Sequence, residues 1–157
     1  IAVALPISLS PIVGTIYSTG SFKSTLLFSN FKILGLFFTF LLGTINRELQ
    51  LDIIDINHDN KSNIMTVPVK YGTNYTIKLS ILLHTILTFN LYFTSKIKVL
   101  AIICCIKQYI TLSYMYFNTR IIHNKYNTMS NYILKELCKY STNESMFISI
   151  ILLLSYI

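Results

Sequence analysis

The sequence predicts an all-α protein, a bundle of helices embedded in a membrane. Of its 157 residues, 53% are hydrophobic and only 12% are charged, whereas soluble domains carry roughly 25% charged residues. The mean hydropathy is +0.58. Apolar segments of helical length recur along the chain, with short polar breaks between them. Together these observations are typical of an integral membrane protein.

The first half of the chain contains two of the expected helices. Residues 1–18 are apolar, and their two prolines are expected to kink a helix in lipid without ending it. A second apolar segment covers residues 31–47. Its glycines, Gly35 and Gly43, are expected to let neighbouring helices approach closely.

Three more apolar segments follow, at about residues 75–93, 99–117 and 145–157. The polar region 118–142 separates the last two, and part of it has the pattern of an interfacial amphipathic helix. Since a span needs ~20 residues, we expect about five transmembrane helices, the first and last of them incomplete.

We interpret residues 1–157 as a single transmembrane domain that lacks its N-terminal half. The chain begins with Ile1, inside an apolar stretch and without a basic leader. Its net charge of +7 comes from scattered Lys and Arg, with no basic helix, which argues against nucleic-acid binding. Basic loops are expected instead to meet anionic lipid headgroups or phosphorylated substrates.

The window from Arg47 to Gly72 contains most of the acidic residues. Glu48, Asp52, Asp55 and Asp59 follow one another at i, i+4, i+7 and i+11. This spacing places four carboxylates on one stripe of one helix, where like charges repel. A bound cation would relieve that repulsion, and Mg²⁺ is the hard cation that carboxylates share with a substrate phosphate. The alternative is a solvated acidic helix end.

This window resembles the second aspartate-rich motif of the UbiA superfamily of intramembrane prenyltransferases. The family's D-x-x-x-D pair corresponds to Asp55 and Asp59, its upstream aspartate to Asp52, and its closing T-L-P-V-x-x-G stretch to residues 66–72, TVPVKYG. Two family glycines are replaced, by His58 and by Asn63. Asn63 is a mild change, because asparagine also adopts the left-handed conformation; His58 is interpreted as a tolerated surface residue.

The resemblance implies a fold, an activity and a set of site residues. Family members have nine transmembrane helices, of which this chain would supply the fifth to the ninth, so the first aspartate motif would be missing. They are Mg²⁺-dependent transferases that move a prenyl group from an isoprenoid diphosphate to a lipophilic or aromatic acceptor. Asp55 and Asp59 would be catalytic, Asp52, Asp55 and Asp59 would bind the metal, and Lys61 and Arg47 would bind the diphosphate.

Several alternatives remain open from the sequence. The chain could be part of a cation channel or transporter, although such a pathway gives no reason for the TVPVKYG segment. It could also be a degenerate, non-catalytic membrane protein. The acceptor could be an aromatic precursor of quinones, tocopherols or chlorophyll, or a glycerol-phosphate lipid. A plastid, mitochondrial or bacterial inner membrane would suit equally. Two polar residues within apolar segments, His84 and Lys107, stay outside the predicted site.

Overall fold

A computed structural model describes residues 4–19, 31–94, 98–122 and 132–143. Every regular element in these residues is a helix, so the all-α prediction is confirmed for this part of the chain. The expected helix at 145–157 lies outside the described residues. The helices are α1 (Ala4–Thr19), α3 (Phe31–Lys61), α4 (Val67–Tyr71), α5 (Thr73–Thr94) and α6 (Lys98–Ile122), with a further helix at residues 132–143.

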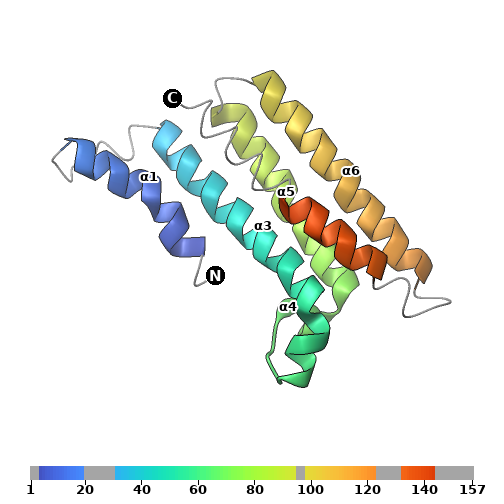
Figure 1. The fold of residues 1–157 in the computed structure, drawn as a ribbon. Coiled ribbons are helices and arrows are strands. Elements are labelled where there is room, and N and C mark those ends of the chain that lie inside the picture. The colour runs from blue at the N-terminus through green and yellow to red at the C-terminus, as the bar shows by residue number, and fades with distance from the viewer. Residues whose placement is uncertain (1–3, 20–30, 95–97, 123–131, 144–157) are drawn as a thin grey trace.

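Three long helices form the body of the molecule (Figure 1). The chain runs along α3, returns along α5 and turns again into α6, so α5 packs against both of the others. Helix α1 packs on α3, and the short α4 contacts α3 and α5 at the end where α3 finishes. Helix-to-helix connections of this kind place successive helices antiparallel.

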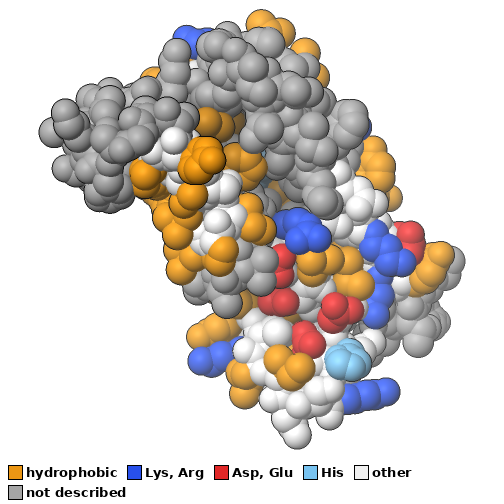
Figure 2. All heavy atoms as spheres, turned by 60° about the vertical axis from the view of Figure 1, so that its left-hand side comes forward, with side chains coloured by type: hydrophobic (Ala, Val, Ile, Leu, Met, Phe, Trp, Pro, Cys, Tyr) orange, Lys and Arg blue, Asp and Glu red, His pale blue; other side chains and the backbone are white. Residues whose placement is uncertain are grey.

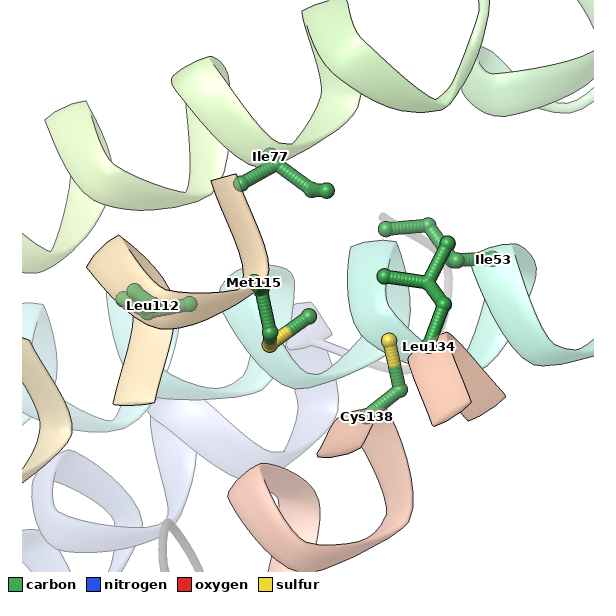
Figure 3. Packing of buried hydrophobic residues seen from close by; sticks show 6 residues of the cluster. All are labelled: Ile53, Ile77, Leu112, Met115, Leu134 and Cys138. Atoms are coloured by element: carbon green, nitrogen blue, oxygen red, sulfur yellow. The ribbon is translucent and has the colours of Figure 1, made fainter. Parts of the chain in front are cut away.

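The main apolar core lies where the last part of α3 meets α5, α6 and the 132–143 helix (Figure 3). It is formed by Ile53, Ile77, Leu112, Met115, Leu134 and Cys138, each less than 9% exposed. Because Ile53 belongs to the acidic window and Leu134 to the region after α6, the core brings these two regions to the same end of the molecule.

At the opposite end, side-chain amides and hydroxyls join α3 to α5. The Asn90 amide donates to the Gly35 carbonyl at 2.8 Å and to the Thr39 hydroxyl at 2.9 Å. Gly35 is buried there, as expected for a point of close helix approach. The expectation for Gly43 was wrong, because a Cβ at that position would meet no atom of the described residues within 4 Å.

The observed helices differ in length from the expected segments. Helix α3 does not end near Arg47 but continues through all four carboxylates to Lys61. Of the described helices, Thr73–Phe93 within α5 is long and apolar enough to cross a membrane. The arrangement of about five crossings in a nine-helix fold therefore stays a prediction.

Candidate functional site

The acidic residues of the stripe lie in the second half of α3 and differ in how far they are buried. Asp59 is only 8% exposed. Asp52 is half-buried and Asp55 is exposed. Figure 2 shows that Asp and Glu side chains gather on one face of the molecule, with Lys, Arg and His side chains around them. The carboxylates predicted from helical spacing to share a stripe therefore do lie on one side of α3.

The carboxylates of this stripe influence one another. The pKa of Asp52 is raised, first by its partial burial and then by the negative charges of Asp59 and Glu48, with a smaller contribution from Asp55. A raised carboxyl pKa means that the ionised form is disfavoured where it stands. At Asp52 the first cause of the raised pKa is burial, and the neighbouring carboxylates add to it.

The end of α3 is shaped by a left-handed residue. Asn63 has φ +54°. The Ile64 amide donates to the Asp59 carbonyl at 2.8 Å, and the Asn63 amide donates to the Asn60 carbonyl at 3.4 Å. This pair of bonds is the Schellman arrangement that commonly ends helices, with asparagine in the position that glycine usually occupies. It reverses the chain, so that the residues after the helix return toward Asp59.

The returning segment makes a direct contact with Asp59. The Thr66 hydroxyl donates to Asp59 Oδ2 at 3.3 Å. Thr66 is also the residue immediately before α4, where a threonine hydroxyl usually caps the first amides of the helix. No such cap bond is made here. The hydroxyl that could stabilise α4 is instead directed at the buried carboxylate.

The segment TVPVKYG forms α4 in its centre. Pro68 lies in the first turn, where the missing amide hydrogen costs no helical bond. Gly72 ends the helix with φ +86°, and its amide donates to the Pro68 carbonyl at 3.0 Å. The proline and the glycine therefore begin and end a five-residue helix that keeps Thr66 next to Asp59.

The predicted cationic residues lie at different places around the stripe. Arg47 donates from Nη1 to Glu48 Oε1 at 3.1 Å, and its buried Nε has no hydrogen-bond acceptor among the described residues. Lys61 is the last residue of α3 and is exposed. His58 is exposed as well, with Nδ1 4.0 Å from Asp59 Oδ1. His58 is thus a surface residue beside the stripe.

The predicted metal ligands are not tested by the structure. Within the described ranges, no three His, Cys, Asp or Glu side chains are placed to enclose a metal ion by themselves. The available donors are carboxylate oxygens, the ligand type that Mg²⁺ prefers. Metal binding by Asp52, Asp55 and Asp59 therefore stays a prediction.

Sequence reasoning missed a buried polar cluster on the α5-facing side of α3. The Ser80 hydroxyl donates to Asn46 Oδ1, and Gln50 Nε2 donates to the Ser80 oxygen at 3.3 Å. All three residues are at most 2% exposed. The signal in the sequence was an Asn and a Gln four residues apart in an apolar helix, a spacing that places both on one face.

The two polar residues inside the apolar segments have different surroundings. His84 is 1% exposed, and its Nε2 lies 3.2 Å from the Cys105 carbonyl oxygen on α6. Lys107 is exposed, with Nζ 5.8 Å from the centre of the Tyr140 ring. Neither contact reaches the acidic stripe, which agrees with leaving both residues out of the predicted site.

Comparison with known proteins adds one partial similarity. Over 54 residues, 34% of this chain, the sequence is 44% identical to digeranylgeranylglyceryl phosphate synthase from Methanosphaera stadtmanae. That stretch is 19% of the length of the synthase. No protein-family description matches the chain, and no solved structure matches it. The match supports the superfamily resemblance, and it leaves the details of the aspartate motif untested.

Proposed function

We propose that this chain carries half of the active site of a membrane prenyltransferase, which moves a polyprenyl group from an isoprenoid diphosphate to an acceptor. The observation that carries the proposal is the Thr66 hydroxyl, which bonds Asp59 at 3.3 Å instead of capping α4. The Thr66 hydroxyl orients the Asp59 carboxylate and leaves α4 without a side-chain cap, which indicates that the orientation of Asp59 serves a function. The similarity to a prenyl-lipid synthase supplies the reaction class.

The acidic stripe would hold the charged end of the substrate. The residues fit Mg²⁺ in donor type, because their side chains offer carboxylate oxygens. After burial, Asp59 and Glu48 both act on the pKa of Asp52 through their negative charges, so the carboxylates of the stripe are close enough to influence one another. Mg²⁺ usually takes one or two carboxylates together with substrate phosphates and water. When bound, it would neutralise the charge that develops on the diphosphate leaving group.

The residues of this chain have separate roles in the proposal. Asp55, which is exposed, and Asp59, which Thr66 orients, would be the catalytic pair that faces the metal-bound diphosphate. Asp52 would complete the metal ligands. Lys61 and Arg47 would contact the diphosphate oxygens as charge-assisted donors. Freeing Arg47 for this would require it to leave Glu48, to which it is bonded at 3.1 Å.

The location and the acceptor also belong to the proposal. We propose a multi-pass membrane protein, with the prenyl chain in an apolar environment that excludes water from the reacting carbon. The partial similarity to digeranylgeranylglyceryl phosphate synthase favours a glycerol-phosphate lipid over an aromatic compound as acceptor. The match covers 19% of that synthase, so the activity of a whole protein is inferred here from a part.

The test is an acceptor assay on the protein with its upstream coding sequence restored. Labelled geranylgeranyl diphosphate is supplied with Mg²⁺ and, in separate reactions, with a geranylgeranylated glycerol phosphate or a hydroxybenzoate. We expect labelled product with the glycerol phosphate, none after chelation of Mg²⁺, and none from the 157-residue chain alone. Divalent-cation flux through proteoliposomes without any labelled product would instead favour the channel alternative.

A further inference from the structure

A pocket of about 180 Å³ lies between α5 and α6, well away from the acidic stripe. Pockets that enclose a whole small molecule measure roughly 300–1,000 Å³. This one is smaller and open, so it suits one part of a longer molecule. Its walls are formed by residues of α5 and α6: Thr85, Thr88, Phe89, Tyr92, Ile102 and Tyr109.

The hydroxyl groups of both threonines and of Tyr109 in the wall are hydrogen-bonded within the protein. Thr85 donates to the Ile81 carbonyl at 2.9 Å and accepts a hydrogen bond from the Tyr109 hydroxyl. Thr88 donates to the His84 carbonyl at 2.8 Å. The surface left facing the pocket is methyl groups and aromatic rings, so its occupant should be hydrocarbon and not a polar molecule.

A positive charge lies beside one wall of the pocket. Lys98, the first residue of α6, is exposed, and its Nζ is 5.2 Å from the centre of the Tyr92 ring. The same Tyr92 ring lines the pocket. A molecule with a hydrocarbon chain in the pocket would therefore have its polar end within reach of an ammonium group, which favours an anionic head.

The surroundings favour a lipid over a soluble molecule. Phe89 in the wall is exposed, and so are the large hydrophobic residues Phe93 on α5 and Ile103 and Ile106 on α6. An apolar surface of this kind marks a contact with hydrocarbon or with a partner protein. The isoprenoid diphosphate is a poor candidate, because Phe89 is 16 positions along α5 from Thr73, about 24 Å from the acidic end at 1.5 Å per residue.

We propose that this pocket binds one acyl chain of an anionic phospholipid whose phosphate pairs with Lys98. The proposal rests on the membrane location that is part of the proposed function, and it does not depend on prenyl transfer. Lysine near a membrane surface contributes about 1 kcal/mol toward anionic lipid, which corresponds to about a fivefold preference.

The test measures lipid bound to the full chain purified in detergent, by native mass spectrometry. The probes are phosphatidylglycerol and phosphatidylcholine with identical acyl chains. We expect Lys98→Gln to lower phosphatidylglycerol binding about fivefold and to leave phosphatidylcholine binding unchanged. Ile102→Trp, which fills the pocket, should lower the binding of both lipids.

Two matched variants serve as controls. Lys78→Gln removes another exposed lysine that lies over a tyrosine ring, at 5.8 Å from Tyr116, and Ile103→Trp enlarges the exposed neighbour of Ile102 outside the pocket. Both should bind lipid as the wild type does. Equal losses in the control and pocket variants, or displacement of phosphatidylglycerol by geranylgeranyl diphosphate, would overturn the proposal.

The two proposals fail in different ways. Ile102→Trp in the restored full-length protein should still transfer prenyl groups, because the pocket is distant from the stripe. Unchanged lipid binding by Ile102→Trp would reject the lipid site and leave prenyl transfer untouched. Absence of transfer by the restored protein, with lipid binding as expected, would reject the enzyme and keep the lipid site.

Discussion

The two faces of α3 carry polar residues of opposite kinds. Toward α5, Asn46 and Gln50 are neutral, buried and joined through Ser80. Toward the acidic surface, the side chains are charged. Among the described residues, no set of ion pairs neutralises the whole stripe. Asp59, for example, contacts the Thr66 hydroxyl and has the His58 ring nitrogen 4.0 Å away. The first face joins two helices, whereas the second carries the carboxylates that the proposed function assigns to a ligand.

The largest expected effect is a loss of prenyl transfer when a carboxylate of the acidic face is removed. In the full-length protein, Asp59→Ala should lower prenyl transfer at least about 100-fold, since removal of one group that stabilises transition-state charge typically costs that much. Asp55→Ala should behave alike. Transfer of labelled geranylgeranyl diphosphate measures both. Asn60→Ala, an exposed neighbour on α3, is the control and should keep its activity.

The next largest effect is a loss of stability when the buried polar cluster on the neutral face is broken. Ser80→Ala removes the hydroxyl that joins Asn46 to Gln50, so the buried amides of these two residues lose a hydrogen-bond partner. The free energy of unfolding should fall by about 1–3 kcal/mol. Chemical denaturation in detergent measures the change. Thr111→Ala is the control, because the Thr111 hydroxyl bonds the Lys107 carbonyl of its own helix. A marginal loss for Ser80→Ala, equal to that of Thr111→Ala, would show that the cluster does not hold the helices together.

A smaller effect is expected where the charged face meets α4. Thr66→Val keeps the shape of the side chain and removes the hydrogen bond to Asp59, so transfer should fall by about 3–10-fold, the equivalent of about one hydrogen bond. Thr66→Ser should restore most of the activity. Thr76→Val, whose hydroxyl otherwise bonds the Gly72 carbonyl, provides the control. Wild-type rates in Thr66→Val would remove the orienting role.

The smallest effect is a gain in stability. The pKa of Asp52 is raised, chiefly by burial and then by Asp59 and Glu48, so its ionised form opposes folding. At pH 7, Asp52→Asn should relieve repulsions of ~0.2–0.5 kcal/mol per pair and raise Tm by about 1–2 °C. The gain should vanish as the pH falls below the carboxyl range, where wild-type Asp52 is protonated too. Thermal unfolding at both pH values measures it, and a loss of stability at pH 7 contradicts the assignment.

Local features of the site could be predicted from the sequence. Helical spacing predicted the common stripe of Glu48, Asp52, Asp55 and Asp59, and the preference of asparagine for the left-handed region predicted the turn at Asn63. Both depend on neighbours within a few residues, where backbone geometry determines the outcome.

The features that sequence reasoning missed depend on contacts between distant residues or on competing bonds. Ser80 lies 30 or more positions from Asn46 and Gln50, and their pairing follows from how α3 and α5 pack. Gly43 differs from Gly35 because the described helices approach at one glycine and not at the other. The Thr66 hydroxyl had two possible partners, and the fold decides in favour of Asp59.

The unbroken course of α3 has a consequence for where water and lipid would meet. A hydrocarbon layer of ~30 Å takes up about 20 residues of helix. Counted from Phe31, where α3 begins, that layer would end at about residue 51, one position before Asp52. In that placement the aspartates emerge together at the membrane surface. In the proposed function, a diphosphate and its counter-ions could then reach the aspartates from the aqueous side while the prenyl tail stays in the hydrocarbon layer.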